Sequence, residues 1–183
     1  SPQLPAMGEC GRSLALLGAS ADATGLDGAR GVVYDAATQL AFVASAGADS
    51  LAVVDVSDPS GPSLVGSVSD PSGLNGASGV ALDAAAQLAF VVSAAGDSLA
   101  VVDVSDPSEP SVVGTLAASS LAGASSVVHD AATQRVFIAS PDASALAVVD
   151  VSDPARPTLV GVFTDATSLD GALGVFYDAP TRR

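Results

Sequence analysis

A nine-residue segment, LAVVDVSDP, occurs three times without change, at residues 51–59, 99–107 and 146–154. The copies begin 48 and 47 residues apart, so the chain contains an internal repeat of that period. Repeats of this length are typical of solenoids and propellers, in which each unit buries its apolar surface against its neighbours. The repeat therefore restricts the chain to architectures that stack one supersecondary unit.

Four short apolar segments recur in every unit. In the first unit they are residues 31–34, 40–45, 51–56 and 63–68, and turn-forming residues separate them. Four short strands divided by turns is the pattern of a propeller blade. The third segment is apolar without alternation, which indicates a strand buried on both faces. We therefore predict an all-β, β-propeller-like fold.

The repeat also predicts how the chain is divided. We expect an N-terminal extension, a lone outer strand, three complete four-stranded blades and a lone inner strand, at residues 1–14, 15–20, 31–78, 79–125, 126–173 and 174–177 respectively. This set of strands does not complete a ring of four-stranded blades. We therefore expect part of a larger propeller, or open blade ends that pair with a second chain through exposed strand edges and apolar faces.

The nonapeptide has two interpretations, a ligand site used three times or a packing unit. Its first six residues fit the buried strand, and its SDP tripeptide fits the turn that follows. Asp58 is able to accept hydrogen bonds from nearby backbone N–H groups, and Pro59 fixes φ near −65°. We favour the packing unit, and we expect Asp35, Asp55 and Asp58 to cap turns at one end of the blades.

Composition excludes several functional classes. The chain has a net charge of −14, from 20 acidic residues against six arginines and no lysine, so its surface repels nucleic acid. Without lysine there is no P-loop and no Schiff-base site within these residues. No apolar stretch approaches the roughly 18–20 residues of a membrane span, so we expect no membrane insertion. The single cysteine, Cys10, excludes an internal disulfide.

The loops that join one unit to the next vary more than the strands. These loops, residues 21–30, 69–78, 117–125 and 164–173, are expected to meet at one mouth of a central channel. Their candidate ligand- or cation-binding residues are Asp22, Asp27, Asp70, Asn75, Asp165 and Asp170. Calcium is the cation that suits such oxygens, but no EF-hand spacing is present, and solvated glycine-containing turns are the alternative. Arg30, at the end of one loop, is either an anion contact or a surface arginine.

Three residues at one position of the inner strand are candidates to face the channel: Tyr34, His129 and Tyr177. His129 is the only histidine, so a histidine-cluster metal site is excluded. It either contacts a ligand or fills an aromatic-sized slot. Asp130 does not suit it as a dyad partner, because adjacent strand residues point to opposite faces. With no nucleophile elbow or dinucleotide fingerprint, we assign neither catalytic residues nor a metal.

The segments LAVVDVSDPSGP, LAVVDVSDPSEP and LAVVDVSDPARP resemble the LVIVD repeat. This propeller-type repeat is found in bacterial and archaeal proteins, many of them exported or at the cell surface. The resemblance extends from residue 15 to about residue 178. It implies a β-propeller and supplies no agreed catalytic residues.

The preferred function is therefore a non-catalytic interaction scaffold, extracellular or at a cell surface, that binds a protein or carbohydrate ligand. The alternative is a fragment of a propeller enzyme, a lactonase-like hydrolase or a quinone-dependent dehydrogenase with its site at the channel mouth. The chain has only two glutamates and an incomplete set of polar mouth residues, which argues against the enzyme.

Overall fold

The computed structural model describes residue 19 and residues 25–177, which form three four-stranded antiparallel sheets. Blade 1 consists of β1 (Ala29–Asp35), β2 (Leu40–Ser45), β3 (Ser50–Asp55) and β4 (Ser63–Ser69). Blade 2 consists of β5 (Ala77–Asp83), β6 (Leu88–Ser93), β7 (Ser98–Asp103) and β8 (Ser111–Ala117). Blade 3 consists of β9 (Ser126–Asp130), β10 (Arg135–Ser140), β11 (Ala145–Asp150) and β12 (Thr158–Thr164).

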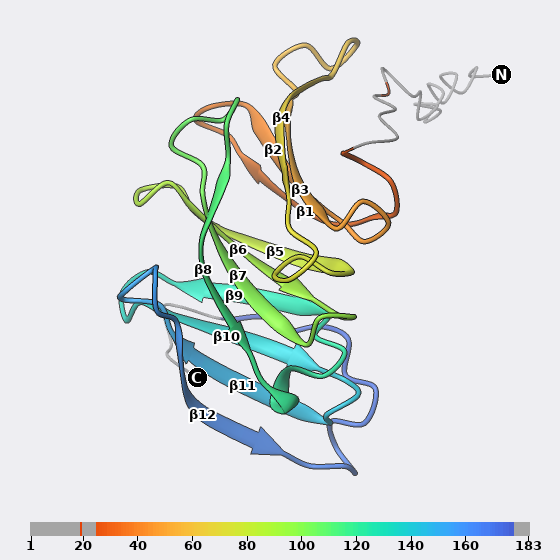
Figure 1. Cartoon of the computed structure of the whole chain (residues 1–183), viewed down its shortest axis with the longest axis vertical. Helices are drawn as coiled ribbons and strands as arrows, with labels where there is room; N and C mark the ends of the chain where they lie inside the picture. Colours follow the sequence, from red (N-terminus) through yellow and green to blue (C-terminus); the bar gives the residue numbers. More distant parts are fainter. Residues whose placement is uncertain (1–18, 20–24, 178–183) are drawn as a thin grey trace, which may run out of the picture.

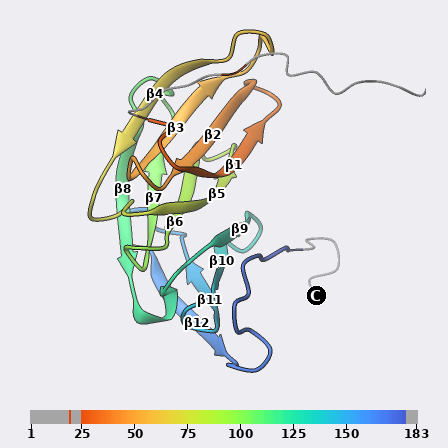
Figure 2. The ribbon, with the colours of Figure 1, turned by 90° about the vertical axis from the view of Figure 1, so that its right-hand side faces the viewer.

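The three sheets follow one another in chain order, from blade 1 at the top of Figure 1 to blade 3 at the bottom. Within each blade the strands are hydrogen-bonded in sequence order, and the inner strands β1, β5 and β9 adjoin one another. Figure 2 shows the same blades from the side, fanned open rather than closed into a ring. The predicted all-β, propeller-like fold is confirmed.

The hydrophobic core lies between the blades. One cluster joins Phe42, Leu51 and Val53 of blade 1 to Val91 and Val102 of blade 2. A second cluster joins the opposite face of blade 2 to blade 3 in the same way. Burying each such side chain contributes roughly 1.5–3 kcal/mol, and one blade alone has no partner for its faces. The stacking of blades is therefore what makes each sheet stable.

The nonapeptide strand meets its predicted environment in two of its three copies. Residues 51–54 and 99–102 are buried without alternation, as expected for a strand covered on both faces. In β11 the burial alternates instead. One face of blade 3 is thus covered less than the corresponding faces of blades 1 and 2.

Two predicted features at the ends of the repeat have different outcomes. The extension at 1–14 and the outer strand at 15–20 lie outside the described residues, apart from residue 19. The segment 174–177, expected as an inner strand, lies beside β9 and has no assigned strand structure. An inner strand pairs with the second strand of its own blade, and no described strand is in position to do so.

Helical structure in the described residues is limited to the short 3-10 turn η1 (Ser119–Leu121). No described helix has the length and apolar character needed to span a bilayer.

Candidate functional site

The acidic residues of the repeat cap turns, as predicted. Asp58 accepts hydrogen bonds from the Ser60 backbone N–H at 2.9 Å and from the Ser60 hydroxyl at 2.6 Å. Asp55 accepts from the Ser57 N–H at 2.8 Å. These hydrogen bonds stabilise the carboxylate form, so they lower the pKa of both aspartates. The carboxylates of the nonapeptide thus have a structural role.

The SDP turn has a second role, in which it docks onto the preceding blade. A Cβ atom added at Gly66 in β4 would lie 2.6 Å from the carbonyl oxygens of Pro107 and Ser108, in the turn of blade 2. Gly114 in β8 is covered in the same way by the Pro154 carbonyl of blade 3. Gly161, the third copy, has only its strand neighbour Val148 nearby, at 3.8 Å. No turn in the described part of the chain therefore covers Gly161.

At the inner-strand position of the three channel-facing candidates, His129 and Tyr177 contact the preceding blade. His129 lies against Phe90 with ring centroids 4.6 Å apart. Tyr177 stacks on Phe137 with centroids 5.2 Å apart. Tyr34, which has no described blade before it, is 53% exposed. This position is an inter-blade slot, which agrees with the aromatic-slot interpretation of His129.

A carboxylate accompanies the ring in each slot. The His129 Nδ1 lies 3.8 Å from the Asp83 Oδ2 of blade 2, and the histidine side chain is only 4% exposed. Its Nε2 is buried and has no hydrogen-bond partner among the described residues. Burial lowers the pKa of His129, and Asp83 and Asp130 only partly oppose this. This imidazole therefore packs in the interface between blades 2 and 3.

Asp83 was not identified from the sequence as a neighbour of His129. The adjacent Asp130 was considered, but Asp83 precedes His129 by almost one repeat period. The signal was the recurrence of an aspartate at the end of each inner strand, at positions 35, 83 and 130. Whether this aspartate contacts a residue of the next blade depends on how the blades stack.

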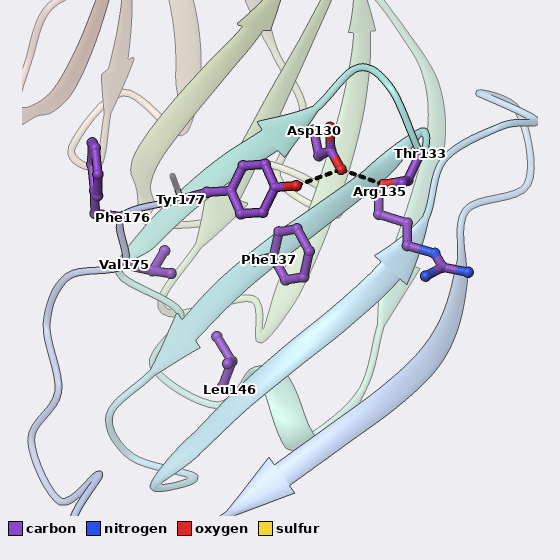
Figure 3. Close-up of a pocket in the computed structure, with 8 residues that line it drawn as sticks. All are labelled: Asp130, Thr133, Arg135, Phe137, Leu146, Val175, Phe176 and Tyr177. Atoms are coloured by element: carbon purple, nitrogen blue, oxygen red, sulfur yellow. Dashed lines mark hydrogen bonds between the residues drawn. The ribbon is translucent and has the colours of Figure 1, made fainter. Parts of the chain in front are cut away.

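The cavity drawn in Figure 3 lies on the less covered face of blade 3 and has a volume of about 380 Å³. Phe137 and Leu146 form its apolar floor. The Tyr177 hydroxyl donates a hydrogen bond to the Asp130 Oδ2 at 2.9 Å, and Thr133 donates to the same oxygen at 2.6 Å. Arg135 lies at the edge and is exposed.

The equivalent region of blade 1 is much smaller because the next blade covers it. Only about 70 Å³ remains there, between Asp35 and Phe42 on one side and Leu82, Val104 and Pro107 on the other. The cavity of Figure 3 is therefore the uncovered half of an inter-blade interface.

The predicted mouth residues have separate surroundings. Asp70 and Asp165 cap their own turns, by accepting from the Ser72 and Thr167 N–H groups. Asp27 and Asp170 are exposed, Asn75 is half-buried, and Asp22 lies outside the described residues. Within 25–177, no three acidic, histidine or cysteine side chains are grouped so as to hold a metal ion. Binding by this set stays a prediction.

A second, more polar cavity of about 250 Å³ lies at this mouth, where the inner strands begin. Its lining includes four residues at equivalent positions of the repeat, Arg30, Ser78, Ser125 and Leu173. Loops of adjacent units are in contact here, as shown by the hydrogen bond that the Gly76 N–H donates to the Asp49 Oδ1 at 2.7 Å. The variable loops and the ends of the inner strands therefore form one surface, which we call the mouth surface.

Sequence comparison identifies one family. The model of the LVIVD repeat matches residues 39–72, 89–117 and 136–165. Each match includes the nonapeptide and the outer strand that follows it. No curated protein sequence matches the chain.

Structural comparison finds propeller-like relatives of low sequence identity. The hydrazine synthase of Kuenenia stuttgartiensis has a TM-score of 0.65 at 16% identity, over 81% of this chain and 38% of that chain. A putative 6-phosphogluconolactonase of Bacteroides fragilis has a TM-score of 0.67 at 10% identity, over 81% and 41%. A periplasmic gluconolactonase of Pseudomonas aeruginosa has a TM-score of 0.63 at 13% identity, over 79% and 44%. The chain thus spans less than half of these structures.

Proposed function

Because the chain belongs to the LVIVD-repeat family and folds into propeller blades, we propose that it is a non-catalytic interaction scaffold with its ligand at the mouth surface. The observation that carries this proposal is where the units differ. The turn-capping aspartates recur at equivalent positions, whereas one position of the mouth surface holds Arg30 in one unit, serine in two (Ser78 and Ser125) and Leu173 in the last. Arg30 is exposed, whereas the Ser78 and Ser125 hydroxyls donate to backbone carbonyls, so the ligand contact that we propose falls on Arg30.

The chemistry of the mouth surface suits a polar ligand. The cavity combines Arg30 with backbone groups and serine residues, and little of its lining surface is apolar. Arginine offers five donors in a fixed arrangement, which suits carboxylates and vicinal oxygens. A protein segment or a carbohydrate provides such acceptors, and these are the ligand classes that we propose.

Photo-crosslinking tests the location of binding. A photoreactive residue in place of Asp27, on the mouth surface, is expected to capture a partner in the producing organism, and Arg30→Ala in the same chain is expected to abolish the adduct. The matched control replaces Glu109, an exposed residue of the turn after β7 at the other end of blade 2. Equal capture from positions 27 and 109 would contradict the proposal, and so would an adduct that still forms in the Arg30→Ala variant.

The alternative function is lactone hydrolysis, which the names of two structural relatives favour. A direct assay separates the two functions. If the chain is a scaffold, glucono-1,5-lactone is expected to hydrolyse at the same rate with the protein as in buffer alone. Acceleration that Arg30→Ala removes would support the hydrolase instead.

We also propose that the protein is exported or at the cell surface. The periplasmic relative supports this location at the level of fold. Fractionation of producing cells, with an antibody against the purified chain, tests it. Recovery in the cytosolic fraction alone would contradict it.

A further inference from the structure

We propose that the uncovered face of blade 3 binds blade 1 of a second copy of this chain, head to tail. We call the side of a blade that meets the next blade its forward face, and the opposite side its back face. This inference concerns the ends of the stack of blades and is independent of the ligand at the mouth surface.

The forward face of blade 3 carries the residues of an interface that has no full partner. Cross-strand pairing places Phe137 beside Val148, and Leu146 beside Phe163, on this face. Phe137 and Leu146 are half-buried, whereas their counterparts in blade 2 are at most 1% exposed. Phe163 of β12 is 59% exposed. Among the described residues, this apolar face is therefore only partly covered.

The back face of blade 1 supplies the complementary half. Val32 and Tyr34 of β1 are 67% and 53% exposed. Their counterparts in β9, Val127 and His129, are buried against blade 2. The turn that follows β3, with Pro59 and Ser60, is exposed and has no described blade to dock on.

The chain already contains two examples of the proposed contact. In both, an inner strand places a side chain on the phenylalanine of the preceding blade, and an SDP turn covers its outer-strand glycine. At the open end the corresponding elements are Phe137, Gly161 and Asp130 on one copy, and Tyr34 and the Pro59 turn on the other. The Tyr34 hydroxyl would reach the Asp130 carboxylate, as the Tyr177 hydroxyl does.

The segment 174–177 supports this choice of partner, because it already occupies part of the slot. Its sequence GVFY corresponds to GVVY at 31–34, and both are followed by aspartate. The Val175 N–H donates to the Ser126 hydroxyl at 3.2 Å, and Tyr177 stacks on Phe137. Figure 2 shows this segment, in dark blue, beside β9.

A second copy would displace this segment, since β1 offers the same residues as part of a complete sheet. Blade 1 also brings β2 and the turn after β3, which would reach Leu146 and Gly161. The segment 174–177 covers only the inner part of the face, so Phe163 stays exposed. Additional apolar burial is the driving force for the exchange.

Sedimentation velocity tests the contact with the full chain. The wild type is expected to change from the 17.6 kDa monomer to larger assemblies as concentration rises. Gly161→Ala is expected to keep the chain monomeric, because the added Cβ is unhindered within one chain but would meet the incoming turn, as a Cβ at Gly66 would. Tyr34→Asp is expected to do the same, since it would place a second carboxylate against Asp130.

The control is Val113→Asp, which adds the same charge at an exposed position of β8, in the middle blade. It is expected to leave assembly unchanged. Thermal unfolding shows whether each variant remains folded.

Mixing the two blocked variants gives the sharpest result. Gly161→Ala keeps an intact back face and Tyr34→Asp keeps an intact forward face, so an equimolar mixture is expected to form a mixed dimer. A contact in which like faces pair would not be restored by mixing. A wild type that stays monomeric at every concentration, assembly that survives Gly161→Ala, or a mixture that stays monomeric would each overturn the proposal.

Discussion

Blades 2 and 3 carry nearly the same residues on their forward faces and differ in what covers them. Phe90 and Leu99 are fully buried beneath blade 3, whereas Phe137 and Leu146, at the same positions, are only partly buried. Gly114 is covered by the next turn, and Gly161 is not. The repeat therefore specifies a face that is ready for burial, and the neighbouring blade decides whether burial is achieved.

The largest expected effect comes from shortening the same leucine in both blades. Leu99→Ala is expected to lower the free energy of unfolding by about 2–5 kcal/mol, because it leaves a cavity in a core closed on both faces. Leu146→Ala should cost clearly less, since its site is partly open and relaxes more easily. Urea unfolding of the two variants measures the difference. Equal losses would mean that blade 3 is covered as completely as blade 2.

The outer-strand glycines give a difference of sign. Gly66→Ala is expected to destabilise by about 1–3 kcal/mol, because the new Cβ would lie 2.6 Å from two carbonyl oxygens of the next turn. Gly161→Ala has room, and replacing glycine in a strand reduces the entropy of the unfolded chain, so a gain of about 0.5–1 kcal/mol is expected. Urea unfolding of the monomer at low protein concentration measures both changes in the free energy of unfolding. A loss of stability in Gly161→Ala comparable with that in Gly66→Ala would mean that the space beside Gly161 is also covered.

Much of the fold followed from the sequence because the period and the strand pattern are local properties. The near-continuous apolar run at 51–56 predicted burial on both faces, which residues 51–54 show, and the turn chemistry of Asp55 and Asp58 predicted their capping hydrogen bonds. The inner strand at 174–177 was predicted from the same local pattern, and this segment has no assigned strand structure. A strand also needs a partner strand, which a local pattern does not contain.

The inter-blade contacts were out of reach for a different reason. In the sequence, nothing distinguishes Gly66 from any other strand glycine, although its missing side chain leaves room for the turn of the next blade. The pairing of His129 with Asp83 joins residues from two blades. Both depend on the rotation between neighbouring blades, which is fixed by packing over whole faces rather than by any short segment.

A smaller effect is expected where loops link one blade to the next. The Asp97 Oδ1 accepts a hydrogen bond from the Gly123 N–H at 3.1 Å, whereas Ser144 occupies the equivalent position in blade 3. Asp97→Ala is expected to cost about 1 kcal/mol, the usual net value of one such bond. Ser144→Ala should cost less, because no described side-chain bond is lost. Thermal unfolding compares them, and an equal loss would refute the link between blades.

The smallest effect concerns pH, at the slot between blades 2 and 3. Burial lowers the pKa of His129 in the folded chain, so the unfolded chain binds a proton more readily. Stability from this group is therefore complete above the unfolded pKa of about 6.5 and is lost as pH falls through the lower folded value. The capping aspartates lose stability only in a more acidic range, because their lowered pKa values start from 3.8.

The matched variant is His129→Leu, because Leu82 already fills the equivalent slot between blades 1 and 2. Urea unfolding between pH 7 and pH 5 should show wild-type stability falling with acidification, and the variant should show a flatter profile. If the wild type instead gained stability on acidification, attraction to Asp83 would outweigh burial, and the slot would hold a charged histidine. Parallel profiles would mean that His129 titrates alike in both states and would contradict a net effect of its burial on stability.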